Sequence, residues 1–235
     1  MLVRELIRAG KTPVLAVDAD PNANLHEALG VEVLENLGSM REDAFTKNMP
    51  SGMSRLDYIK YRFMQVLVES EGFDLIAMGR PEGTGCYCFA NDLLKTCMRT
   101  LERDYRVIII DSEAGMEHIS RGTIGIPDLL LIVSDPGARG LRTASRIQEI
   151  ALSLGIDRGR MHLVFNRYKQ GVAPVAAGRE APIAVIPYDP NIEEADLAAS
   201  PVSLVPDTSA AKIAARALAR KIIILAEEKE KNQAQ

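Results

Sequence analysis

Two cysteines separated by one residue, Cys86 and Cys88, lie in a glycine-rich segment with the sequence GTGCYC. A tetrahedral site for a soft metal takes four ligands, and one such pair supplies two of them. None of the three histidines lies near the pair in the sequence. A second copy of the chain, related by a two-fold axis, would bring the other two sulfurs. The pair therefore predicts a metal site shared between two subunits.

The alternative interpretation of these cysteines is structural, because a buried free cysteine behaves as a small hydrophobic residue. We apply that interpretation to Cys97, which falls in a segment with the pattern of a helix. It suits Cys86 and Cys88 less well, because loops are exposed and the start of a helix favours the thiolate.

Carboxylates follow two apolar segments at the points where each is expected to end as a strand. Asp111 closes the run VIIID, and Asp18 and Asp20 follow the run PVLAV within the segment DADPNAN. Carboxylates on neighbouring strand ends repel one another unless a cation or a polarised water lies between them. The pattern predicts a Mg²⁺-nucleotide site, although an aspartate after a strand is also a common N-cap of a helix.

Apolar runs alternate along the chain with amphipathic segments of helical period. This arrangement is typical of a doubly wound, mostly parallel sheet with helices on both faces, the α/β class. In such sheets ligands bind at the carboxyl ends of the strands. The expected strands are 13–17, 73–78, 107–110, 129–133, 161–165 and 183–186, and the expected helices are 2–10, 56–68, 89–101, 141–154 and 210–226.

The length and composition fit one globular domain over residues 1–226, followed by a polar tail at 227–235. Of the 235 residues, 47% are hydrophobic and 26% are charged, which argues against disorder and against a disulfide scaffold. The net charge of −4 disfavours nucleic acid as a partner. No apolar run reaches about 18 residues and the first residues lack a secretory pattern, so we expect a cytoplasmic protein without a membrane partner.

Six segments of the chain together resemble one family. They are VLAVDADPNANL (14–25), MGRPEGTGCYCFANDLL (78–94), VIIIDSEAGMEHISRG (107–122), VSDPGARGLRTASRI (133–147), VFNR (164–167) and IPYDPNIEEAD (186–196). They resemble the accessory ATPases for nickel insertion into carbon monoxide dehydrogenase, which belong to the deviant-Walker P-loop ATPases together with the division-site and chromosome-partitioning ATPases. The CxC segment and DSEAGMEH are the specific parts of this resemblance.

The resemblance implies roles for the acidic residues and the cysteines. Asp20 would orient the attacking water, Asp18 would support the Mg²⁺ shell, and Asp111 would be the Walker B aspartate. Cys86 and Cys88 would bind Ni²⁺ or Zn²⁺ across a homodimer. The client would be carbon monoxide dehydrogenase or an acetyl-CoA synthase type of nickel enzyme.

The resemblance also implies contacts to ATP or ADP. Asn166 would bind the adenine through its amide, although an asparagine at a strand end is equally a turn residue. The loop after Ile186 would close over the base. The remaining candidate nucleotide-binding residues are Asn24, Glu113, Arg167, Pro187, Tyr188 and Asp189.

The sequence departs from this family in one large respect, because it contains no P-loop of the G-x-x-x-x-G-K-[ST] type. Residues 1–10 align with the end of the helix that follows the P-loop in the family, so the first strand and the P-loop are expected to be missing. The sequence either starts too late or has lost these parts naturally. We expect weak ATP binding and little hydrolysis from the chain as written, since the P-loop cradles the phosphates.

Three other functions remain open from the sequence. Because the sequence contains no P-loop, it is also compatible with a non-catalytic metal-binding module. A partitioning or division-site ATPase would need a basic surface or an amphipathic anchor, and the polar ending EEKEKNQAQ disfavours the anchor. An iron–sulfur carrier of the same superfamily would differ in the metal bound at the cysteines.

Overall fold

The computed structural model describes residues 1–40, 50, 52–80, 94–95, 98, 101–113, 125–169 and 181–233. Contacts between residues group the chain into two compact units. One unit contains Leu6–Ile124, and the other contains Met1–Glu5 together with Gly125–Gln235. We describe each unit by itself, and call them the first and the second unit in that order.

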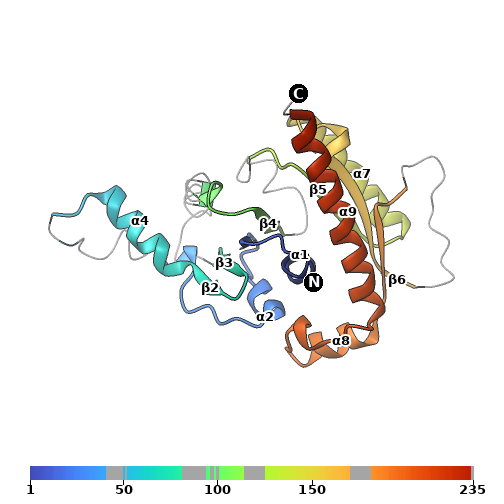
Figure 1. Cartoon of the computed structure of the whole chain (residues 1–235), viewed down its shortest axis with the longest axis horizontal. Helices are drawn as coiled ribbons and strands as arrows, with labels where there is room; N and C mark the ends of the chain where they lie inside the picture. Colours follow the sequence, from blue (N-terminus) through green and yellow to red (C-terminus); the bar gives the residue numbers. More distant parts are fainter. Residues whose placement is uncertain are drawn as a thin grey trace. The chain divides into compact units, whose positions relative to one another are not determined.

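The first unit contains a four-stranded sheet with the order β2-β3-β1-β4 (Figure 1). Strand β1 (Val14–Asp18) pairs in parallel with β3 (Phe73–Ala77) on one side and with β4 (Val107–Asp111) on the other. The short strand β2 (Val68–Ser70) pairs antiparallel with β3 at the edge. Every residue of β1 is buried, as expected for the middle strand of a parallel sheet.

Apolar side chains of the first unit pack into one cluster around β1 and β3. Helix α4 (Arg55–Val66) contributes Phe63 and Val66 to it, and it begins at Ser54, whose hydroxyl accepts the N–H of Asp57 at 3.2 Å. Two shorter helices, α1 (Leu2–Arg8) and α2 (Leu25–Leu29), precede and follow β1 in the chain. The cluster also contains Leu15, Val17, Ala19, Leu37, Met40, Ile76, Met78, Leu94, Met98 and Leu101.

The second unit contains a parallel sheet with the order β5-β6-β7. Its strands are β5 (Leu130–Ser134), β6 (Met161–Tyr168) and β7 (Ala184–Pro187). Helix α7 (Ala138–Ser153) packs against β5 and helix α9 (Ala210–Gln233) against β7, on opposite sides of the sheet (Figure 1). The short elements η1 (Arg158–Arg160), α8 (Pro190–Leu197) and η2 (Val202–Leu204) complete it.

These two sheets confirm the predicted α/β class with mostly parallel strands, and each expected strand is found within a few residues of its predicted bounds. Elements of three to eight residues were not predicted: β2, α2, α8, η1 and η2. The expected helix at 89–101 lies largely outside the described residues.

The proposal that residues 1–226 form a single domain stays a prediction. No helix in the described part of the chain is long and apolar enough to cross a membrane.

Helix α9 continues to Gln233, seven residues beyond the predicted end at Ala226. The sequence EEKEKNQ consists largely of good helix formers. Lys229 also fixes this last part, because its ammonium group donates to the carbonyl oxygen of Asp128 at 2.9 Å and lies 3.3 Å from the Asp128 carboxylate. The polar composition of the segment is therefore compatible with a helix held by an ion pair.

A close approach at Gly79 gives a test of how the end of β3 packs. Gly79 has a φ of +64°, and a Cβ added there would lie 2.2 Å from Cγ of Asn36. Asn36 cannot move away freely, because its Oδ1 accepts the N–H of Ser39 at 2.9 Å. We expect Gly79→Ala to lower the free energy of unfolding by about 2 to 4 kcal/mol, through the left-handed backbone and the collision together.

Gly10→Ala is the matched control in the same unit. Gly10 has a φ of +72° and open space around its added Cβ, so only the backbone effect of about 1 kcal/mol applies. Urea unfolding of both variants measures the difference. Equal losses for the two variants would contradict the packing described at Gly79.

Candidate functional site

Parallel pairing brings the acidic ends of β1 and β4 to the same edge of the sheet. Asp18 and Asp111 are partners in the register of the two strands. The ladder continues one step further, where the N–H of Ala19 donates to the carbonyl oxygen of Asp111 at 2.8 Å. On the other side, the N–H of Met78 donates to the carbonyl oxygen of Asp18 at 2.8 Å. The ends of three adjacent strands are thus held together at this edge.

Asp18 organises the loop that follows β1. Asp18 is 1% exposed. Oδ1 accepts the N–H of Asp20 at 3.1 Å, and Oδ2 accepts the N–H of Leu25 at 2.8 Å. These two bonds close the loop between the strand and α2, because they join its start to its end.

Asp20 lies inside this closed loop. Its Oδ1 accepts the N–H of Asn22 at 2.8 Å, and its carbonyl oxygen accepts the N–H of Ala23 at 3.0 Å. Ala23 has a φ of +51°, so the loop contains a tight turn in the left-handed region. Asn22 also accepts a hydrogen bond from the guanidinium of Arg80, which follows β3. The backbone of the acidic loop is therefore held by hydrogen bonds within the loop, and Arg80, from the segment after β3, contacts the Asn22 side chain.

The carboxylates make this edge electrostatically unfavourable in the absence of a cation. Burial raises the pKa of the Asp18 carboxyl, an effect that the N–H groups of Leu25 and Asp20 oppose. Although the Asp111 side chain reaches solvent, partial burial raises its pKa as well, and the charges of Asp18 and Asp20 raise it further. Raised carboxyl pKa values are common where a site awaits a positive ligand.

The donor set fits Mg²⁺ bound together with phosphates. In nucleotide sites Mg²⁺ takes one or two carboxylates and completes its shell with water and phosphate oxygens. Asp111 and Asp20 supply carboxylates of this kind at one edge of the sheet. Within the described ranges, no group of three or more His, Cys, Asp or Glu side chains is arranged to hold a metal by itself. The edge is therefore suited to a metal that brings phosphate ligands with it.

Two further residues of the first unit were predicted to contact nucleotide. Asn24 stands at the N-cap of α2, with an exposed side chain that makes no capping hydrogen bond. Glu113 lies two residues after β4 and is half-buried. Both residues follow the strands that carry Asp18 and Asp111.

Cys86 and Cys88, the predicted metal ligands, lie outside the described residues.

The predicted base-binding residues lie at the carboxyl ends of β6 and β7 in the second unit. The pairing of these strands is irregular between Phe165 and Tyr168, and Arg167 has a φ of +54°. Oδ1 of Asn166 accepts the N–H of Arg167 at 2.9 Å, which leaves the NH₂ side of the amide to donate. A strand irregularity with an uncommon backbone angle is frequent beside binding sites.

Charged and aromatic side chains surround this irregularity. The hydroxyl of Tyr188 donates to the Glu193 carboxylate, and the guanidinium of Arg167 lies 4.0 Å from the same carboxylate. The ammonium group of Lys169 lies over the Tyr188 ring, 5.1 Å from its centre. Pro187 ends β7 and Tyr188 follows it, so these residues are placed beside the end of β6. The structure thus brings Asn166, Arg167 and Tyr188 to one edge of the sheet.

Asp189 differs from the other predicted nucleotide-binding residues, because its side chain is buried and used within the protein. It is 6% exposed and forms the N-cap of α8. The Ser209 hydroxyl donates to it at 2.6 Å and, as the largest effect, lowers the pKa of the Asp189 carboxyl far below its usual range. The N–H of Ala211 and the groups of Asn191 act in the same direction against the cost of burial.

Sequence reasoning did not identify Ser209 and Lys212, which contact the Asp189 region. A signal for Lys212 was present, because the charged residue stands among small residues of α9 that are buried, Ala211 and Ala215. The pair Asp189-Pro190 was also a signal, since aspartate at the N-cap and proline at the first helical position are typical of a helix start.

Comparison with known proteins gives relatives in sequence and in structure. A scan against protein-family models found no match. The chain is 36% identical to an uncharacterized ATP-binding protein of Methanocaldococcus jannaschii, MJ0685, over 219 residues that cover 89% of this chain and 87% of the relative. A second such protein of the same organism, MJ0823, is 33% identical over 218 residues. The alignment covers 85% of this chain and 82% of MJ0823.

The carbon monoxide dehydrogenase accessory protein CooC of Rhodospirillum rubrum is 38% identical over 172 residues, which cover 66% of this chain and 64% of CooC. Solved structures of lower identity share the fold alone. The cell division ATPase MinD of Pyrococcus furiosus is 22% identical, with a TM-score of 0.68 over 95% of this chain and 90% of MinD. A ParA family ATPase of Chlorobium tepidum is 20% identical, with a TM-score of 0.69 over 93% of this chain and 88% of the ATPase.

The fold is therefore that of the MinD- and ParA-type P-loop ATPases. The sequence relatives are described as ATP-binding proteins, and they are similar to this chain over most of its length. CooC is a further homologue, with similarity over about two thirds of the chain. This protein belongs to the family of ATP-binding proteins that includes MJ0685 and MJ0823 of Methanocaldococcus jannaschii.

Proposed function

We propose that this protein is an ATP-dependent accessory protein of the metallochaperone type, with little ATP hydrolysis expected from this sequence because it contains no P-loop motif. Its client is carbon monoxide dehydrogenase or a related nickel enzyme, and nickel is its cargo. The similarity to CooC, whose name connects it with carbon monoxide dehydrogenase, supports the choice of client. The observation that carries the nucleotide part of the proposal is the placement of Asp18 and Asp111 as register partners at the carboxyl edge of the sheet.

In this proposal the acidic residues of the first unit serve the phosphate end of a nucleotide. Asp18 closes the loop that contains Asp20, and so fixes the carboxylate proposed to orient the attacking water. Asp111 is the proposed Mg²⁺ ligand. When bound, Mg²⁺ neutralises the charge of the nucleotide phosphates. Asn24 and Glu113 are proposed to contact the nucleotide from the residues that follow the same strands.

Residues of the second unit are proposed to bind the base. The NH₂ group of Asn166 would donate to a ring nitrogen of adenine, because its amide oxygen already accepts the Arg167 N–H. Pro187, Tyr188 and Arg167 surround the same edge. Cys86 and Cys88 are proposed to bind the cargo metal, which can be Ni²⁺ or Zn²⁺ in vitro. Two copies of the chain would together supply four sulfur ligands.

The Asp111→Asn variant tests the acidic edge. A carboxyl with a raised pKa in the folded state keeps its proton longer than in the unfolded chain, so stability falls as the pH rises from its usual pKa through its raised pKa. Asparagine removes this loss. We expect the free energy of unfolding at pH 7 without ligands to rise slightly, by no more than about 0.5 kcal/mol, because solvent screens the exposed carboxylate.

The same variant should lose the additional stabilisation that Mg²⁺ gives in the presence of ADP. Thermal unfolding with ADP, with and without Mg²⁺, measures this effect. Asp104→Asn, an exposed carboxylate of the same unit that precedes β4, is the control and should keep the wild-type response. A Mg²⁺ effect of unchanged size in Asp111→Asn would contradict the proposed role of Asp111.

The cysteine pair is tested by metal content and mass. Anaerobically purified full-length protein loaded with Ni²⁺ or Zn²⁺ should run as a dimer in light scattering, with one metal ion per two chains. Cys86→Ser and Cys88→Ser should each remove the metal and the metal-dependent dimer, whereas Cys97→Ser should keep both. A metal-loaded monomer would exclude the shared site, and iron with sulfide in the metal analysis would favour an iron–sulfur carrier instead.

The cargo step needs a client assay. Nickel-free carbon monoxide dehydrogenase is incubated with a limiting amount of Ni²⁺, with ATP and with the full chain, and CO oxidation is followed. We expect faster recovery of activity with the wild-type protein than with Cys86→Ser or Cys88→Ser. Equal recovery with wild type and both variants would contradict nickel delivery by this cysteine pair.

A further inference from the structure

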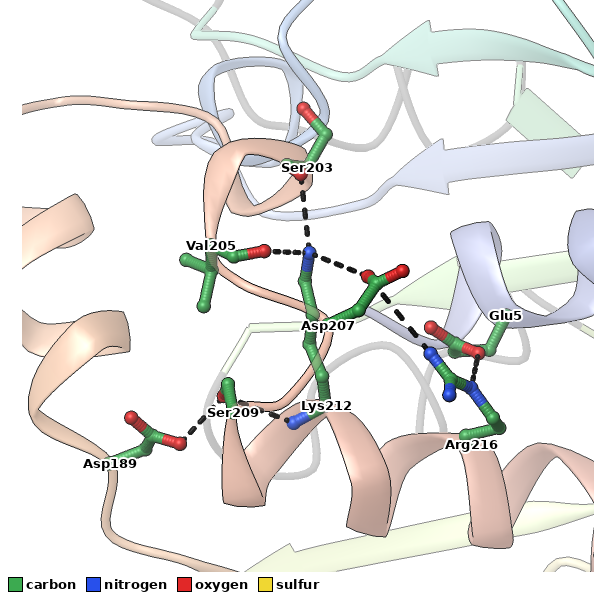
Figure 2. A network of polar contacts seen from close by, with 8 residues as sticks. All are labelled: Glu5, Asp189, Ser203, Val205, Asp207, Ser209, Lys212 and Arg216. Carbon is green, nitrogen blue, oxygen red and sulfur yellow. Dashed lines mark hydrogen bonds and ion pairs between the residues drawn. The ribbon is translucent and has the colours of Figure 1, made fainter.

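A buried polar network joins the end of β7 to the starts of α8 and α9 (Figure 2). Its centre is the Asp189 carboxylate, on which every oxygen accepts two hydrogen bonds. Oδ1 accepts the backbone N–H of Asn191 at 3.0 Å and the Asn191 amide at 2.8 Å. Oδ2 accepts the Ser209 hydroxyl at 2.6 Å and the N–H of Ala211 at 3.0 Å. The carboxylate is thus satisfied by the protein itself.

Lys212 holds the segment before α9 in the same network. Its side chain is 7% exposed, and its ammonium group donates to the carbonyl oxygens of Ser203, at 3.2 Å, and of Val205. The Asp207 carboxylate lies 3.5 Å from it. An ammonium group has three protons to donate, and Figure 2 shows the three acceptors around it. The buried ammonium group therefore donates two hydrogen bonds and has one ion-pair partner.

Ser209 connects these two charged centres. Its hydroxyl donates to Asp189 and accepts the backbone N–H of Lys212 at 3.4 Å. The network also reaches the first residues of the chain, because the guanidinium of Arg216, one turn further along α9, donates to the buried carboxylate of Glu5 at 2.8 Å. Removing the Ser209 hydroxyl would leave a buried carboxylate with one donor fewer, which is costly in a water-excluded site.

The network is adjacent in sequence and in space to the proposed base-binding residues. Tyr188 precedes Asp189, and its backbone N–H donates to the carbonyl oxygen of Tyr168 at the end of β6, at 2.8 Å. Its hydroxyl donates to Glu193 of α8. The Tyr188 backbone is therefore fixed on one side by β6 and on the other by the anchored carboxylate of the next residue. Nothing else in the described part of this loop contributes a buried charged side chain.

We propose that Asp189, Ser209 and Lys212 are positioning residues of the base site, which hold Tyr188 beside the end of β6 without touching the nucleotide. The inference rests on the proposed function and changes the role of Asp189 from a contact to an anchor. A loop that is already ordered in its binding geometry loses less conformational entropy when the ligand binds. The network thus contributes to affinity for the base and not to affinity for the phosphates.

Two ligands that differ only in the base separate these contributions. We compare Mg²⁺-ADP with Mg²⁺-ribose 5-diphosphate, by calorimetry on the full chain at a temperature well below unfolding. Ser209→Ala should weaken ADP binding by about tenfold, the effect of losing one hydrogen bond to a buried charge. It should change ribose 5-diphosphate binding by less than twofold. Ser209→Thr keeps the hydroxyl and should restore most of the affinity for ADP.

Ser203→Ala is the matched control, because Ser203 joins the network through its backbone carbonyl oxygen. It should bind both ligands as the wild type does. Circular dichroism establishes that each variant is folded, and if Ser209→Ala does not fold, Asp189→Asn takes its place with the same expected result. Asparagine has the shape of aspartate but lacks the charge that Ser209 and Ala211 stabilise.

The outcomes separate the inference from the proposed function. A wild-type protein that prefers ADP to ribose 5-diphosphate, together with a variant that keeps this preference, would overturn the positioning role alone. A variant that loses affinity for both ligands equally would also overturn it, because the damage would then be general. A wild-type protein without any preference for ADP would overturn the proposed base site and the inference together.

Discussion

The parallel register of β1 and β4 is the constraint on which the candidate site depends. It places Asp18 opposite Asp111, and the ladder continues past both residues through the N–H of Ala19. Partial burial raises the pKa of the Asp111 carboxyl, and the charges of Asp18 and Asp20 raise it further, which weakens the folded state at neutral pH. The fold accepts this repulsion because β1 is buried among apolar side chains and Asp18 is held by two backbone N–H groups. A cation at this edge would reduce the repulsion, and this supports the proposed metal-nucleotide site.

Asp18 and Asp189 show how the same side chain serves two purposes. Both are almost fully buried, at 1% and 6% exposure. The pKa of Asp18 is raised because burial outweighs its two backbone donors, while the pKa of Asp189 is lowered because four hydrogen bonds, led by that of Ser209, outweigh burial. The carboxylate of Asp18 therefore remains able to gain from a positive ligand. The carboxylate of Asp189 is already satisfied and gains little from one.

Much of this architecture follows from local patterns in the sequence. The largely apolar runs at 13–17, 73–78 and 107–110 predict buried parallel strands, and the carboxylates that follow the first and the third predict where polar chemistry collects. The short antiparallel strand β2 and the helices α2 and α8 have too few residues to give a periodic signal. The roles of Asp189, Ser209 and Lys212 depend on contacts between residues about 20 apart in the chain, so no local pattern reveals that Asp189 is buried.

Binding of a metal ion together with a nucleotide at the acidic edge is the central claim, and paramagnetic resonance of Mn²⁺ tests it most directly. Mn²⁺ takes the oxygen ligands that Mg²⁺ takes, and its free signal disappears when it is bound to protein. With the full chain and ADP present, we predict that the free Mn²⁺ signal falls, and that Asp20→Asn and Asp111→Asn together restore it to the level of ADP alone. An equal fall in the wild type and in the double variant would contradict the claim.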